Sequence, residues 1–129
     1  MLINDLNSKF EISYLGFVEN SSLLSHFYDR QLFVSPTKGE NFGYAIAESL
    51  SVSVPVLIST NTPFKNIKHL KFGFDCNLEN ENLFLDSLLF FLSLDNFSYN
   101  NYREVLSNNY RNYYNLETIK SSYINLFTK

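Results

Sequence analysis

Short apolar runs, each bounded by turn residues, recur along the first part of the chain. Four of them predict strands, the last more weakly than the others: residues 10–15, 31–35, 55–59 and 72–76. Helical patterns fill the intervals, since apolar residues recur on one face after Asn20-Ser21-Ser22, which offers an N-cap, and again over residues 43–53. A third, short helix is expected to begin at Pro63, whose missing N–H costs nothing at the first helical position.

The rest of the chain has apolar residues at helical spacing and predicts three C-terminal helices, at residues 80–94, 99–114 and 116–127. Strands that alternate with helices need crossover connections, which favour a parallel sheet with helices on both faces. We therefore expect an α/β fold with a partial Rossmann-like parallel sheet of about four strands, followed by three helices. Residues 1–129 are expected to form one domain, because this length leaves no room for a second.

Composition narrows the class of protein. Hydrophobic residues make up 45% of the sequence and charged residues 18%, which is typical of a chain that folds. The net charge of −3 and the lack of a basic cluster argue against nucleic-acid binding. One cysteine and two histidines offer no metal-ligand cluster, and no apolar stretch is long enough to span a membrane. We expect a cytoplasmic protein, or one that is peripheral to a membrane.

The candidate chemistry lies in residues 38–50, directly after the second predicted strand, where the sequence reads KGENFGYAIAESL. Ligands of open parallel sheets bind beyond the carboxyl ends of the strands, which is where this segment begins. Gly39 and Gly43 let the loop turn sharply and a ligand approach the backbone, although both could serve turn geometry alone. A helix that begins near Gly43 directs its free N–H groups at the same crevice, which suits an anion such as a diphosphate.

Two carboxylates belong to this segment. Glu48 interrupts an apolar helix face, where a carboxylate is costly to bury without a hydrogen-bond donor. Along a helix, Glu40 and Glu48 would lie roughly 12 Å apart, too far for an acid/base pair acting on one bond. That separation suits two contacts on an elongated ligand. Taken alone, Glu40 is more simply a solvated loop carboxylate. The apolar neighbours of Glu48 argue against the alternative that it is a surface residue of an amphipathic helix.

Residues 35–50, together with the strand at 55–59, resemble the E-x7-E segment of family 4 glycosyltransferases, which have the two-domain GT-B architecture. Upstream, residues 12–18 are similar to that family's strand-Gly-x-Val element, so the likeness covers nearly the whole chain. The resemblance implies a truncated nucleotide-sugar-binding C-terminal domain. It also implies a retaining transfer, without metal or cofactor, from a nucleotide-diphosphate sugar in surface polysaccharide or glycan biosynthesis.

The resemblance also assigns roles to residues. Glu40 would contact hydroxyls of the donor sugar, and Glu48 would bind the ribose hydroxyls. Sugar and phosphate would meet the backbone of Asn41, Phe42, Gly43 and Tyr44. No catalytic residue is assigned, because the family's basic diphosphate-binding residues and its acceptor domain belong ahead of residue 10. We therefore expect weak donor binding and little or no transfer by this chain alone. Ser53 stands where family members usually have glycine.

Other classes of protein stay open. The chain could be a non-catalytic interaction module that docks on a separately encoded glycosyltransferase half, or one that self-associates through an exposed sheet edge. An unrelated nucleotide-binding protein is a weaker alternative, because the sequence has no G-x-G-x-x-G or Walker loop. The C-terminal tyrosines are expected to pack within the helices, or to face such a partner: Tyr99, Tyr102, Tyr110, Tyr113, Tyr114 and Tyr123.

Overall fold

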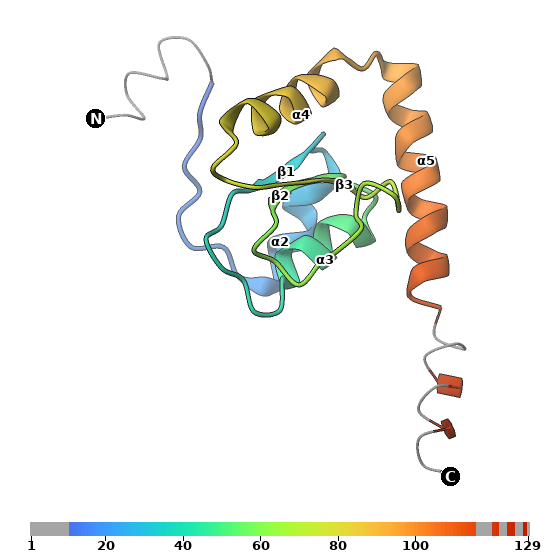
Figure 1. The fold of residues 1–129 in the computed structure, drawn as a ribbon. Coiled ribbons are helices and arrows are strands. Elements are labelled where there is room, and N and C mark those ends of the chain that lie inside the picture. The colour runs from blue at the N-terminus through green and yellow to red at the C-terminus, as the bar shows by residue number, and fades with distance from the viewer. Residues whose placement is uncertain (1–10, 116–119, 122–123, 126–127, 129) are drawn as a thin grey trace.

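The computed structural model describes residues 11–115, 120–121, 124–125 and 128, and its architecture is α/β (Figure 1). Its strands form one parallel sheet in the order β1-β2-β3, which are Phe33–Ser35, Val56–Ser59 and Gly73–Cys76. Leu57 in the central strand aligns with Val34 on one side and Phe74 on the other. Three parallel strands in sequence order are compatible with half of a doubly wound sheet.

Helices cover both faces of this sheet. α4 (Glu81–Ser93) lies over one face and contacts β2 and β3, while α3 (Tyr44–Ser51) lies under the other face and contacts β2 (Figure 1). α2 (Asn20–Tyr28) packs against α3 on the same side, and α5 (Asn96–Tyr113) runs past the sheet and contacts α3. The predicted parallel sheet with helices on both faces is therefore confirmed for the described residues.

The central strand β2 is the middle of the hydrophobic core, because all four of its residues have an exposed fraction of 0%. A continuous apolar run of this kind is typical of a parallel strand that is buried on both faces. Val56 and Ile58 pack in one cluster with Ile46 and Leu50 of α3 and with Leu106 of α5. Each such aliphatic side chain contributes roughly 1.5–3 kcal/mol when it is fully buried.

α5 is fastened to the rest of the fold by polar contacts as well as by its apolar face. Arg103 donates from Nε to the carbonyl of Ser53 at 3.0 Å and from Nη2 to that of Val52 at 3.2 Å. These two carbonyls follow the last turn of α3, where free acceptors and the negative end of the helix dipole favour a cation. The guanidinium of Arg103 therefore caps α3 from the neighbouring helix.

Three of the C-terminal tyrosines are half-buried and contact other elements, as expected for helix packing. The Tyr99 hydroxyl donates to the Gln31 carbonyl at 2.8 Å, and the Tyr110 hydroxyl donates to the Ala47 carbonyl at 3.3 Å. Burial raises the pKa of Tyr102 to about 12, since the phenolate would lose its hydration. The Tyr110 hydroxyl therefore holds α5 against α3, and the Tyr99 hydroxyl holds it against the segment that precedes β1.

The sheet has three strands among the described residues, where about four were expected. Residues 11–15 of the first predicted strand form no strand, and residue 10 lies outside the described residues. Tyr14 is 85% exposed and Leu15 56% exposed, so this run does not join the core. An apolar run becomes a strand only where it pairs with a neighbouring edge, and residues 11–15 are not part of the three-stranded sheet.

Two predicted helices differ from the structure. The short helix expected from Pro63 is replaced by turns, because Asn66 and Lys71 adopt left-handed φ angles of 57° and 59° that interrupt a right-handed helix. The last C-terminal helix, at 116–127, lies mostly outside the described residues. α2 begins at Asn20 with Glu19 as its N-cap and without a side-chain capping bond, one residue earlier than the expected cap.

Ser53 gives a stability prediction, because it follows α3 with a left-handed φ of 62°. A Cβ in that conformation costs about 1 kcal/mol, which glycine avoids. We predict that Ser53→Gly raises the free energy of unfolding by about 0.5 kcal/mol, since the greater entropy of glycine in the unfolded chain offsets part of the gain. Chemical denaturation measures the change. Ser53→Ala keeps the Cβ and serves as the control, so an equal gain in both variants would contradict the explanation.

Candidate functional site

The loop between β1 and α3 is fastened to the end of β2. The Ser59 hydroxyl, fully buried at the last position of β2, donates to the Thr37 carbonyl at 2.5 Å. The Glu40 amide donates to the Asn61 carbonyl at 3.2 Å, and the Thr37 hydroxyl donates to the Gly39 carbonyl at 2.7 Å. Both loops leave the carboxyl ends of neighbouring parallel strands, where ligands of such sheets bind. The candidate site therefore has a fixed backbone.

Glu40 lies in this loop and turns its carboxylate onto the loop's own backbone. Its Oε1 accepts hydrogen bonds from the amides of Phe42 at 3.3 Å and Gly43 at 3.1 Å. A carboxylate there also faces the positive end of the α3 dipole, which stabilises its charge. The expected helical separation of Glu40 from Glu48 does not apply, because α3 begins only at Tyr44 and Glu40 precedes it.

Gly43 is the N-cap of α3 and adopts a left-handed φ of 68°. A Cβ at this position would lie 2.7 Å from Cε2 of Phe64, so both the backbone angle and the space require glycine. The first bond of the helix runs from the Ala47 amide to the Gly43 carbonyl at 3.0 Å, which leaves the amides of the first turn of α3 for other acceptors. Gly39 has no such constraint, since no described residue other than its two chain neighbours lies within 4 Å of the space that its Cβ would occupy.

Glu48 lies on α3 one turn after Tyr44, and its side chain is half-buried. Its Oε2 is buried and has no hydrogen-bond partner among the described residues, and the same is true of the Thr62 hydroxyl in the loop after β2. A buried polar atom without a partner costs roughly 1–3 kcal/mol and is uncommon in native proteins. Glu48 belongs to α3 and Thr62 to the loop after β2, and both segments border the candidate site.

The remaining predicted site residues, Asn41, Phe42 and Tyr44, are exposed. The rings of Phe42 and Tyr44 stack on one another, with centroids 5.5 Å apart and planes inclined by 24°. The sequence assigned a role to the backbone of these residues and not to their side chains. The structure therefore places all six predicted binding residues in one loop and the first turns of one helix, and adds a pair of exposed rings.

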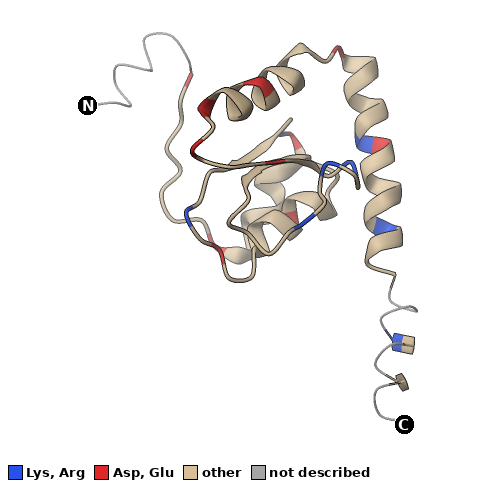
Figure 2. Cartoon of the chain, viewed as in Figure 1, with Lys and Arg blue, Asp and Glu red and all other residues tan. Residues whose placement is uncertain are grey.

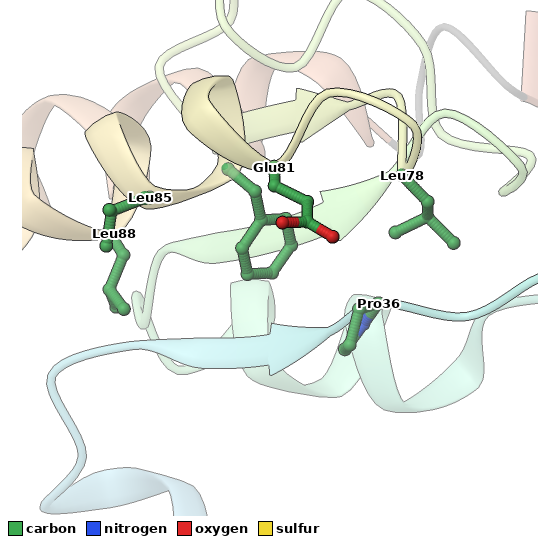
Figure 3. A pocket seen from close by; sticks show the side chains of 6 residues that line it. Pro36, Leu78, Glu81, Leu85 and Leu88 are labelled. Carbon is green, nitrogen blue, oxygen red and sulfur yellow. The ribbon is translucent and has the colours of Figure 1, made fainter.

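An apolar hollow lies on the other side of the sheet, between α4 and the end of β1, and it was not predicted from the sequence. It has a volume of about 260 Å³ and is lined by Pro36, Leu78, Glu81, Phe84, Leu85 and Leu88 (Figure 3). Pro36 follows β1 directly and connects this hollow to the loop that carries Glu40. The available signal was the number of leucines in α4, which exceeds what one buried helix face needs.

Charged groups are spread over several elements. Figure 2 shows acidic residues on α4 and basic residues on α5 and in the loop that leads into β3. That loop contributes Lys68, His69 and Lys71 to a polar hollow of about 550 Å³ beside β3. No group of three or more His, Cys, Asp or Glu side chains in the described part of the chain is placed to hold a metal ion. Within the same part, no helix is both long and apolar enough to cross a membrane.

The two glycines of the loop give a paired prediction. We expect Gly43→Ala to lower the free energy of unfolding by about 2 kcal/mol, because alanine must adopt a left-handed φ and press against the Phe64 ring. Gly39→Ala, in the same loop, is expected to change it by less than about 0.5 kcal/mol. Thermal and urea denaturation of the two variants side by side measures the difference. Similar losses in both variants would show that Gly43 carries no special constraint.

Comparison with known proteins adds no relative to this description: no family model, curated protein or solved structure matches the chain. The functional argument consequently depends on the geometry of the Glu40 loop and α3.

Proposed function

We propose that the chain binds a nucleotide-diphosphate sugar at the loop of residues 36–43 and the first turns of α3, as the donor-binding part of a retaining glycosyltransferase that makes a surface polysaccharide or glycan. The observation that carries this proposal is the buried Oε2 of Glu48, which has no hydrogen-bond partner among the residues that the structure describes. A carboxylate oxygen is an acceptor without a proton of its own, so it is complemented by hydroxyl groups. Ribose hydroxyls supply such donors.

The first turn of α3 supports the diphosphate part of the proposal. The amides of this turn have no acceptor within the helix, because the first helical hydrogen bond is donated by the Ala47 amide. The helix dipole adds partial positive charge at the same end. The Oε1 atom of Glu40 uses the Gly43 amide and leaves those of Tyr44 and Ala45 for a phosphate. The diphosphate would then lie between the two carboxylates along the ligand.

Glu40 supports the sugar part of the proposal. Its side chain is exposed and its Oε1 is held by two backbone amides, so the direction of the carboxylate is fixed by the loop. Its second oxygen, Oε2, is available to hydroxyls of a sugar ring. In the described part of the chain, neither carboxylate is hydrogen-bonded to a second acid or base, which favours binding of a donor over its cleavage. We expect weak binding and no transfer without the cations that stabilise a leaving diphosphate.

The second candidate function is a non-catalytic interaction module that docks on a separately encoded glycosyltransferase half. The exposed leucines of α4 favour it, because Leu85, Leu89 and Leu92 are 50%, 49% and 71% exposed. β1 is at one edge of the three-stranded sheet, so its outer backbone groups face no described strand. An exposed apolar helix beside an open edge is typical of a surface that another chain covers.

The nucleotide proposal predicts opposite effects on stability and binding when Glu48 is changed. Glu48→Gln keeps the size of the side chain but removes the buried negative charge. We expect it to raise the free energy of unfolding by about 1 kcal/mol and to weaken UDP or GDP binding about tenfold, since stability and function compete at a ligand site. Denaturation and isothermal titration calorimetry measure the two effects.

Glu104→Gln on α5 is the matched control, because Glu104 is exposed and distant along the chain from the loop. It should leave both quantities unchanged. Unchanged nucleotide binding in Glu48→Gln would remove the ribose assignment. A loss of stability in the same variant would show that Glu48 serves the fold rather than a ligand.

The interaction-module alternative also predicts self-association at high concentration, because the apolar surface that a partner would cover is open in the isolated chain. We expect sedimentation velocity to show a reversible increase in mass as concentration rises, and Leu92→Glu to suppress it, because the charge disrupts the apolar face of α4. Val105→Glu, on the exposed side of α5, is the control and should not suppress it. A clean monomer over a wide range of concentration would count against a self-complementary surface.

A further inference from the structure

Phe42 and Tyr44 form an exposed aromatic pair in the candidate site. Their rings are 69% and 70% exposed, although large apolar groups of this kind are usually covered in a folded protein. Their planes are inclined by 24°, so the two rings lie nearly parallel. The core pairs are edge-on or tilted instead, such as Phe91–Tyr102 at 84° and Phe72–Tyr110 at 59°. Because the two rings stack on one another, the pair presents the outer face of each ring to solvent.

The backbone that carries this pair cannot easily turn the rings inward. The Phe42 amide is bonded to Oε1 of Glu40, and the next residue, Gly43, is fixed by its left-handed φ and by the Phe64 ring beneath it. Tyr44 is the first residue of α3, so the start of the helix fixes its backbone. Aromatic side chains have few rotatable bonds, so a ligand that stacks here loses little affinity to ordering of the side chains.

Glu40 adds a polar group of defined chemistry beside these rings. Its Oε1 is bonded to the amides of Phe42 and Gly43, which sets the carboxylate against the backbone of the pair. The free Oε2 accepts hydrogen bonds and repels anions. An apolar flat surface beside an acceptor matches a sugar ring, which has a C–H face and donates hydrogen bonds from hydroxyls at its edge.

We propose that the Phe42–Tyr44 pair is a stacking platform for the sugar ring of the donor, with Glu40 accepting hydrogen bonds from that sugar's hydroxyls. The inference rests on the proposed nucleotide-sugar function and adds the side chains that read the sugar. The nucleotide end of the ligand is held elsewhere, by α3 and Glu48. Removal of either ring should therefore affect the sugar and not the nucleotide.

The test compares each nucleotide with its sugar conjugate by calorimetry on the full chain. The probes are UDP with UDP-glucose, UDP-galactose and UDP-N-acetylglucosamine, and GDP with GDP-mannose. We expect at least one sugar to tighten binding of the wild-type chain over the bare nucleotide. Phe42→Ala and Tyr44→Ala should each weaken binding of the sugar conjugate about tenfold, as expected for loss of an aromatic contact. Binding of the bare nucleotide should stay within about twofold of the wild-type affinity.

Two further variants separate stacking from other effects. Tyr44→Phe keeps the ring and should keep the sugar gain. Phe97→Ala removes an equally exposed ring, 78% exposed at the start of α5, and should change nothing. Circular dichroism checks that each variant is folded, which is expected because the rings are exposed.

The outcomes distinguish this inference from the function on which it rests. If both alanine variants weaken the bare nucleotide as much as its sugar conjugate, the rings hold the base and the platform assignment is overturned. If the sugar gain is absent in the wild type or survives both substitutions while nucleotides still bind, the platform fails and the nucleotide proposal stands. If the wild-type chain binds none of the nucleotides, both proposals fail.

Discussion

The complete burial of β2 is the constraint on which the rest of the structure depends. Its residues lie between two parallel neighbours and under helices on both faces, so each must be apolar or internally hydrogen-bonded. The last of them, Ser59, satisfies its hydroxyl by donating to Thr37 in the loop after β1. The core therefore extends a polar contact into the candidate site, and the position of the Glu40 loop follows from how the centre of the sheet is packed.

The two carboxylates of the site are in contrasting states, which is the main physical argument for a ligand. Glu40 is exposed, and its Oε1 is already satisfied by two amides. Glu48 is partly buried, and its Oε2 has no partner among the described residues. A carboxylate with a structural role would be expected to resemble Glu40, because native folds satisfy the polar atoms that they bury. Glu48 instead keeps an unsatisfied acceptor beside the Glu40 loop. A hydroxyl group of a bound ligand would satisfy this acceptor.

Sequence patterns predicted the elements best where burial and local chemistry agree. The run at 55–59 and the helix at 80–94 match β2 and α4 closely, and Asn80 caps α4 by accepting from the Leu83 amide at 3.0 Å. Residues 11–15 show the limit, since a strand pattern does not specify a partner edge. The helix expected at Pro63 fails because a left-handed Asn66 cannot be read from propensity alone. Gly43 was predictable as a special position, whereas the clash with Phe64 that makes it necessary depends on tertiary packing.

The central claim is that a nucleotide binds at the Glu40 loop and α3, and a backbone-amide NMR titration with UDP and GDP tests it most directly. The account predicts shift changes concentrated on the amides of residues 41–48 and of the loop after β2, with smaller changes along α4 and α5. Changes concentrated on the apolar hollow under α4, or no changes up to millimolar nucleotide, would contradict it.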